Sequence, residues 1–423
     1  MEKYVLGNGL RLILVKNERL PIFSYQTFFD VGGRFETQGL TGATHFLEHM
    51  MFKGSRNYPD GAFDSLIEKN GGSANAYTSF DSTVYYENAP VDILEEVIKV
   101  EGDRMSSPNL LPELFEKERL VVLEERRMRY DERPQGRMHL EMMKKAFKGT
   151  PYGGSVIGEV KDLNSLKRDE VMDFFKKFYA PNNAVVVIVG DIDFKKTLEL
   201  IKKNYGQIPR NKKLADLKGQ IDGKNSYQFP RDFSQKVTLH GRPQNPLFSL
   251  VYQGFKKNSK EEQILNVLSG ILGMGESSHL YQKYVKGKRP LVSQISMGPY
   301  SLNNAGILIT SGELLGKISV NRFYKDLIKE LKTSCDVAVT PRNVQKIKNN
   351  YWIALYSKMQ TNSGISSFLG EREAFYGDYK SYTKVFEDYN SIQTDDVKNL
   401  CNKIFRNGKP LYITMWNKHK RKK

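Results

Sequence analysis

Two histidines and a glutamate occur within five consecutive residues, His45-Phe46-Leu47-Glu48-His49. Residues three and four apart share one face of a helix, so all three polar side chains would project from the same side. Two imidazoles one turn apart can bind a single Zn²⁺ ion, and the glutamate can act as general base toward water. The alternative is that the two histidines bind no metal and simply lie on an amphipathic helix. The surrounding residues are strongly apolar, which argues against two histidines without a role there. The spacing therefore predicts a catalytic zinc site.

A catalytic zinc site also needs a third protein ligand and an open position for water. The predicted helix over 112–129 offers two acids, because Glu118 and Glu125 both fall on its apolar face while Glu124 falls at the solvent edge. A buried carboxylate requires a partner. A zinc ion and a zinc-bound histidine would serve, and so would Arg or Lys from a packed neighbour. The residues that define the apolar face are Leu111, Leu114, Phe115, Val121 and Val122.

The sequence repeats itself at an offset of about 225 residues. Residues 20–25 recur as 245–250, and residues 169–171 recur as 395–397. The repeat predicts two homologous domains. Strand-like runs alternate with long helical patterns, which indicates the α+β class with helices layered on one face of a sheet. The strand-like runs of the first copy cover 11–15, 22–31, 83–87 and 184–189.

The two predicted domains cover residues 1–210 and 233–423. Residues 211–232 between them are rich in Lys, Gly, Asn, Asp and Pro, which predicts a linker. In the second copy, Gly270 stands where the first copy has the first motif histidine, and the apolar stretch 263–272 around it contains no His and no acid. The first copy is therefore predicted to be catalytic, and the second is predicted to be non-catalytic.

The composition leaves several partner classes open. The chain has 423 residues, 27% of them charged, and a formal net charge of +17. A net positive charge of this size can attract nucleic acid, an anionic membrane or acidic peptides. The sequence contains no nucleic-acid-binding motif, so we expect no nucleic-acid partner. No apolar run reaches the roughly 18 residues of a transmembrane segment. The basic stretch 418–423 is interpreted as a solvated end rather than a binding arm.

The first residues enter an amphipathic strand pattern without an apolar signal core. We therefore expect a cytoplasmic protein, or a periplasmic or organellar one in an already processed form. Cys335 and Cys401 are far apart in the sequence. We expect them to be two reduced core thiols and not a disulfide.

Residues 44–54 resemble the signature of the inverzincin zinc metallopeptidases, the group of pitrilysin, insulin-degrading enzyme and mitochondrial processing peptidase. The resemblance extends over the whole chain. It implies an endopeptidase that hydrolyses unfolded peptides with a metal-activated water. It makes His45, His49 and Glu125 the Zn²⁺ ligands and Glu48 the catalytic base. By the same resemblance Glu118 supports catalysis by orienting a ligand imidazole instead of binding the metal.

Residues 72–78 resemble the family's sheet-edge strand, which pairs with the substrate backbone beside the zinc. The resemblance makes Asn75 and Ala76 substrate-binding residues, whereas the residue type alone would make Asn75 a turn residue. Family peptidases also carry an Arg and a Tyr, seven residues apart, that grip the substrate. The sequence departs from this pattern, because the matching positions are Lys286 and Ser293.

Members of this family enclose peptides in a clam-shell chamber of four such domains, of which the chain contains two. The resemblance therefore implies that the chain forms half of a chamber and acts as a dimer. A heterodimer with a related family member is slightly favoured over a homodimer, since a partner could supply the missing Arg and Tyr. Two alternatives remain: the catalytic subunit of a heterodimeric processing peptidase, and a non-catalytic structural homologue.

Overall fold

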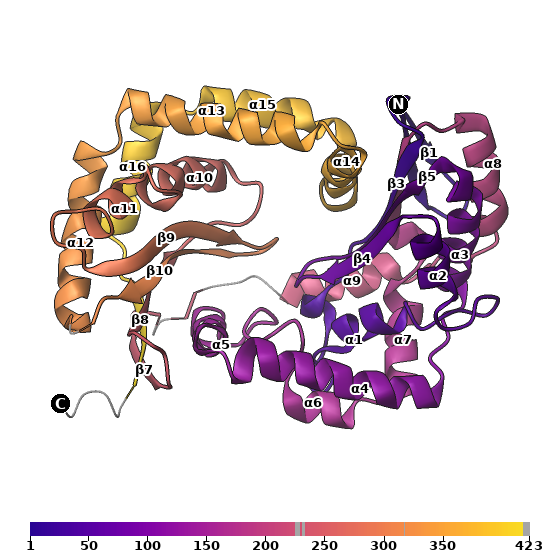
Figure 1. Cartoon of the computed structure of the whole chain (residues 1–423), viewed down its shortest axis with the longest axis horizontal. Helices are drawn as coiled ribbons and strands as arrows, with labels where there is room; N and C mark the ends of the chain where they lie inside the picture. Colours follow the sequence, from indigo (N-terminus) through magenta and orange to yellow (C-terminus); the bar gives the residue numbers. More distant parts are fainter. Residues whose placement is uncertain (225–228, 231–232, 317, 418–423) are drawn as a thin grey trace. The chain divides into compact units, whose positions relative to one another are not determined.

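The computed structural model describes residues 1–224, 229–230, 233–316 and 318–417, so the basic stretch 418–423 lies outside the described residues. The chain forms two compact units (Figure 1). The first unit comprises Met1–Arg126, Gly154–Lys224 and Leu355–Tyr382. The second unit comprises Arg127–Gly153, Asn225–Ala354 and Thr383–Lys423.

The first unit is built on a six-stranded mixed sheet with the order β1-β2-β6-β3-β5-β4. β6 runs parallel to β2, and every other neighbouring pair is antiparallel. The four strand-like runs predicted in this copy all form strands. β6 is buried along its whole length, which explains why it consists of Ala, Val, Ile and Gly. The strands are β1 (Glu2–Val5), β2 (Arg11–Lys16), β3 (Ile22–Phe29), β4 (Ser73–Thr78), β5 (Thr83–Pro90) and β6 (Ala184–Gly190).

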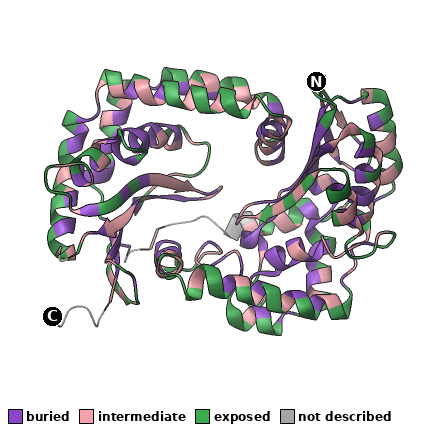
Figure 2. Cartoon of the chain, in the orientation of Figure 1, coloured by how far each residue is buried: buried purple, intermediate pink, exposed green. Residues whose placement is uncertain are grey.

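Amphipathic helices pack against this sheet, with buried residues along their inner faces and on the strands (Figure 2). Among the described residues, no helix combines the length and apolar character that crossing a bilayer requires. The helices of the first unit are α1 (Ala43–Met50), α2 (Ala62–Lys69), α3 (Leu94–Ser106), α4 (Pro112–Arg126), α6 (Val160–Ser165), α7 (Arg168–Phe178), α8 (Phe194–Tyr205), α9 (Leu214–Lys224) and α14 (Asn362–Tyr376).

The second unit repeats the topology of the first for every strand except β1, which confirms the predicted duplication. Its sheet has the order β7-β11-β8-β10-β9, and its parallel pair β7 and β11 matches the pair β2 and β6. The strands are β7 (Lys236–His240), β8 (Leu247–Gln253), β9 (Val292–Ser301), β10 (Gly306–Leu314) and β11 (Leu411–Trp416). The helices are α5 (Pro134–Ala146), α10 (Lys260–Gly273), α11 (His279–Tyr284), α12 (Val320–Val337), α15 (Tyr382–Ser391) and α16 (Thr394–Phe405), with α13 (Pro341–Lys358) leading out of the unit toward α14.

The compact units differ from the predicted sequence halves because two helices are exchanged. α14 belongs to the second half of the sequence but packs on β3 and β6 of the first sheet. Ser366 and Ser24 form a hydrogen bond of 3.0 Å there. A Cβ at Gly370 would lie 2.0 Å from the Phe28 ring, so only glycine permits this close packing. In return α5, from the first half, contacts β11 in the second unit.

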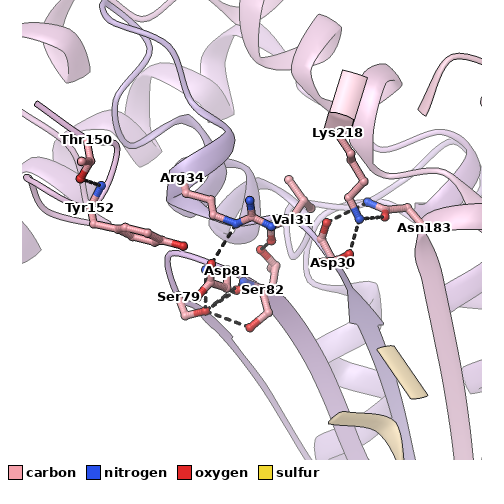
Figure 3. Close-up of polar contacts among 11 residues, drawn as sticks. Asp30, Val31, Arg34, Ser79, Asp81, Ser82, Thr150, Tyr152, Asn183 and Lys218 are labelled. Atoms are coloured by element: carbon pink, nitrogen blue, oxygen red, sulfur yellow. Dashed lines mark hydrogen bonds and ion pairs between the residues drawn. The ribbon is translucent and has the colours of Figure 1, made fainter. Parts of the chain in front are cut away.

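Part of the segment predicted to be a linker is helical and attached to the first unit. α9 carries Lys218, whose ammonium group pairs with Asp30 at the end of β3 and donates to Asn183 Oδ1 at 2.8 Å (Figure 3). Burial lowers the pKa of Lys218 despite the nearby carboxylate. Leu214–Lys224 of the predicted linker thus forms a helix on the first unit.

A buried ion cluster joins α3 to the sheet. Arg104 lies 2.6 Å from Glu101 on the same helix and 3.2 Å from Glu87 on β5, and all three side chains are at most 3% exposed. The guanidinium group also lies over the ring of Tyr85, 4.6 Å from its centroid. Burial raises the pKa of Glu87 well above its usual range, although the neighbouring Arg104 cation acts in the opposite direction.

The two cysteines form a disulfide between α12 and α16, so the prediction of two reduced thiols is wrong. Cys335 and Cys401 are both fully buried, and their Cα atoms are 5.6 Å apart. Their sequence separation of 66 concealed this proximity. The packing of α12 against α16 in the core of the second unit brings the sulfur atoms together.

Candidate metal centre

The helix that carries the histidine motif, α1, begins at a tightly constrained turn. Gly42 precedes the helix with a φ of 89°, and a Cβ at this position would lie 2.2 Å from the carbonyl oxygen of Ile157. The Glu36 carboxylate accepts hydrogen bonds of 2.7 Å from the backbone N–H groups of Gly42 and Thr44. Burial raises the pKa of Glu36 to about 7, although these donors act in the opposite direction. Glu36 thus satisfies donors at the start of α1.

Aromatic packing sets α1 against α4. The rings of Phe46 on α1 and Phe115 on α4 lie 4.5 Å apart, centroid to centroid. Glu118 is buried and Glu124 is exposed, as the helical wheel predicts. Leu111 and Val121 were predicted on the buried face, but they are 52% and 50% exposed. The prediction fails for these two residues because α1 and α6 cover only part of the α4 surface.

Three donor atoms converge between α1 and α4. Glu125 Oε2 lies 3.5 Å from His45 Nε2 and 3.3 Å from His49 Nε2. Among the described residues, this is the one group of three or more His, Cys, Asp or Glu side chains whose ligand atoms all lie within 4.8 Å of one another. Ligand atoms of a tetrahedral zinc site with bonds of about 2.1 Å are about 3.4 Å apart. The three side chains therefore fit a zinc ion.

Glu118 fixes the orientation of the His49 ring. His49 Nδ1 donates to Glu118 Oε1 at 2.7 Å, and Glu118 Oε2 pairs with Lys53 Nζ at 3.1 Å. Burial lowers the pKa of His49, but the carboxylates of Glu118 and Glu125 more than offset this effect and raise it to about 9. The two carboxylates beside the ring supply negative charge, which suits a divalent cation held by Nε2.

Glu48 lies on the same helix as both histidines but outside the three-donor group. It is 9% exposed, and its Oε2 accepts a hydrogen bond from the Thr78 hydroxyl of β4. Its carboxylate is therefore held by the sheet edge while the histidines face Glu125. This arrangement suits a general base beside a metal better than a fourth metal ligand.

β4 is an edge strand of the first sheet and also contacts α1. Asn75 and Tyr77 are exposed, whereas Ala76 and Thr78 are half-buried on the opposite face. Asn75 Oδ1 accepts a hydrogen bond of 2.8 Å from the Ala76 backbone N–H, which is the local role that its residue type suggests. The strand thus offers a backbone edge near the motif helix, and substrate contact by Asn75 and Ala76 stays a prediction.

The two positions that depart from the family's Arg and Tyr lie in the second unit. Lys286 follows α11 and pairs with Glu276 at 2.7 Å. Ser293, on β9, is exposed, and its hydroxyl lies 3.4 Å from the carbonyl oxygen of Glu313. Neither residue presents the aromatic or guanidinium group of the family pattern.

The sequence analysis did not assign a role to three residues around this centre: Glu36, Lys53 and Thr78. Lys53 and Thr78 lie inside the two segments that carry the resemblance. The alternation along β4 was a usable signal, because Thr78 falls on the opposite face from Asn75. Glu36 had no such signal, since it reaches α1 through a loop whose path the sequence does not specify.

Both halves of the chain match models of one peptidase family. Residues 11–160 match the model described as Insulinase (Peptidase family M16), and residues 165–351 match the model described as Peptidase M16 inactive domain. The second match agrees with the apolar helix α10, whose buried residues include no His and no acid. The chain belongs to the insulinase-like peptidase family M16.

Individual relatives cover nearly the whole chain. "Zinc protease PqqE" of Helicobacter pylori is 27% identical over 409 residues, which are 96% of this chain and 90% of the relative. A "Probable mitochondrial-processing peptidase subunit beta" of Arabidopsis thaliana is 23% identical over 94% of this chain and 75% of its own length. The crystal structure of a protease from Helicobacter pylori superimposes with a TM-score of 0.89 at 26% identity, covering 98% of both chains. The chain is thus similar to zinc proteases over nearly all of its length.

Proposed function

We propose that this chain is a zinc-dependent endopeptidase that hydrolyses unfolded peptides. The observation that carries the proposal is the convergence of His45, His49 and Glu125 beside Glu48. The names of the relatives, which include zinc proteases, support the same activity. The presence of both the three donor side chains and the Glu48 carboxylate favours a catalytic chain over a purely structural homologue.

Each residue of the site would have a separate role in peptide hydrolysis. Zinc held by His45, His49 and Glu125 would act as a Lewis acid toward water and the peptide carbonyl. Glu48 would accept a proton from the attacking water and return it to the amide nitrogen as the C–N bond breaks. Glu118 would keep the His49 ring in one tautomer by accepting a hydrogen bond from its Nδ1–H group. One water is consumed for each peptide bond.

The β4 edge would hold the substrate. An extended peptide can add a strand to an exposed sheet edge, and its backbone then supplies most of the hydrogen bonds. The segment that includes Asn75 and Ala76 is the edge next to α1. Backbone pairing depends little on the side chains of the peptide, so this mode suits unfolded substrates of varied sequence.

Turnover of an unstructured fluorogenic peptide tests the proposal. Glu48→Gln should retain zinc and peptide binding but lower kcat by at least about 10²-fold, because the general base is lost. Glu124→Gln, on the exposed side of α4, is the matched control and should keep wild-type activity. A fully active Glu48→Gln variant would remove Glu48 from the mechanism.

We also propose that the active form is a dimer, with a related family member slightly favoured over a second copy as partner. Lys286 and Ser293 stand where the family pattern has Arg and Tyr, and a partner could supply that grip. The relative named as a processing-peptidase beta subunit supports a paired arrangement. Solution mass measured together with peptidase activity, with and without the candidate partner, tests this. Full activity from a strictly monomeric species would refute it.

We propose that the protein works in an oxidising compartment, the periplasm or an organelle, rather than in the cytoplasm. The buried Cys335–Cys401 disulfide supports this location, since disulfides persist mainly where thiols are not kept reduced. Alkylation of the protein directly in cell extracts is the test. Both cysteines should resist labelling until reductant and denaturant are added, and labelling by denaturant alone would contradict the proposal.

A further inference from the structure

The hydroxyl of Thr78 donates a hydrogen bond to Glu48 Oε2. Thr78 is the last residue of β4, on the half-buried face of the strand, whereas Asn75 and Tyr77 are exposed on the other face. β4 also packs against α1, which carries Glu48. The proposed base therefore has a partner on the same edge strand that would hold the substrate.

The turn that follows Thr78 is stabilised by hydrogen bonds within the turn and by an ion pair with Arg34 (Figure 3). Within the turn, Ser79 Oγ accepts hydrogen bonds from the backbone N–H groups of Asp81 and Ser82, at 3.2 and 3.0 Å. From outside, the Arg34 guanidinium group pairs with Asp81 at 2.9 Å, and the side chain of Arg34 is only 5% exposed. Thr78 thus ends a strand whose following turn is held by an ion pair with a buried arginine.

We propose that Thr78 is a positioning residue that holds the Glu48 carboxylate in the orientation needed for proton transfer. The inference rests on the proposed role of Glu48. A hydroxyl that donates to a carboxylate forms a charge-assisted bond, stronger than one between neutral groups. This bond engages Oε2 and restricts rotation of the carboxylate, which would hold it in one orientation for accepting a proton from water. Catalysis is sensitive to such placement, since a shift of about 1 Å can cost about 10²-fold in rate.

Three variants of the β4–β5 hairpin separate positioning from folding. Thr78→Val keeps the shape of the side chain but removes the hydroxyl, and Thr78→Ser keeps the hydroxyl. Thr83→Val is the matched control, because Thr83 lies directly opposite Thr78 and its hydroxyl donates to the Val31 carbonyl at 2.9 Å instead of to Glu48. The readouts are kcat and KM on an unstructured fluorogenic peptide, together with zinc content.

Thr78→Val should lower kcat by about 10- to 100-fold, with KM and zinc content within about 2-fold of wild type. Thr78→Ser should recover most of the loss, and Thr83→Val should keep kcat even if its Tm falls. In a Glu48→Gln background, Thr78→Val should cause no further loss, because the two residues act as one unit.

Two kinds of failure can be told apart. Wild-type kcat in Thr78→Val, or an equal further loss in the Glu48→Gln background, would overturn the positioning role while leaving the proposed function in place. A wild-type protein without turnover, or an unimpaired Glu48→Gln variant, would overturn the proposed function and this inference with it. A loss that Thr78→Ser does not recover would assign Thr78 a structural role only.

Discussion

Removal of single carboxylates along α4 should produce a graded loss of zinc affinity. Three acids on this helix occupy different positions relative to the donor group: Glu125 contributes Oε2 to it, Glu118 contacts His49 Nδ1, and Glu124 is exposed. The expected order of loss in the Glu→Gln variants is therefore Glu125, then Glu118, then Glu124. The helix stays the same, so differences between the variants report the position of each carboxylate.

The position of each carboxylate determines how much zinc affinity its removal should cost. Partners that orient a metal-bound imidazole are worth about 10- to 100-fold in affinity, which is about 1.4–2.7 kcal/mol. Glu118→Gln should fall in that range, because its hydrogen bond to His49 is 2.7 Å long and Gln can keep only part of its strength. Glu125→Gln should lose more than this, since it weakens one of three donors. Glu124→Gln should stay within about 2-fold of wild type.

Competition with a zinc chelator of known affinity measures the three constants at one pH and ionic strength. Circular dichroism of each metal-free variant controls for changes in folding. Equal losses for Glu125→Gln and Glu124→Gln would refute the assignment of Glu125 to the donor group. A loss at Glu118 as large as that at Glu125 would mean that Glu118 binds the metal directly.

Three further predictions concern stability. Arg104→Met leaves two buried carboxylates without their cation and should cost about 3–5 kcal/mol in urea unfolding, whereas a loss under about 1 kcal/mol would contradict the buried cluster. Replacement of Cys335 and Cys401 by Ser should cost about 4 kcal/mol from the 66-residue separation, and an unchanged Tm would contradict the cross-link. Burial raises the Glu36 pKa from 4.5 to about 7, so its contribution to stability is present below pH 4.5 and lost as pH rises through 7. Glu36→Gln should therefore show a weaker decline between pH 5 and 7 than wild type in urea unfolding, and parallel curves would contradict this assignment.

The sequence was most informative where the signal is local. His45 and His49 lie four residues apart, and any helix places them on one face. The repeat at about 225 residues predicted two similar domains, and the matching strand orders of the two sheets confirm it. The partner of this histidine pair was harder to identify, because Glu118 and Glu125 both fell on the apolar face. The resemblance, not the helical wheel, distinguished them.

Features that depend on contacts between distant segments were not predictable. The apolar pattern of α4 does not say how much of that face a neighbour covers, so Leu111 and Val121 were expected to be buried. The disulfide needs the packing of α12 on α16, which no spacing between cysteines reveals. The exchange of α14 onto the first sheet is likewise invisible in a repeat, since a repeat fixes which segments are equivalent but not which copy they pack against.

Anomalous diffraction at the zinc edge, from crystals of the metal-loaded protein, tests the metal centre most directly. We expect one zinc ion per chain, with about 2.0–2.2 Å separating it from His45 Nε2, His49 Nε2 and one oxygen of Glu125. Glu48 should lie outside this set and keep its hydrogen bond to Thr78. A zinc ion bound elsewhere, or one ligated by Glu48 in place of Glu125, would contradict the proposed site.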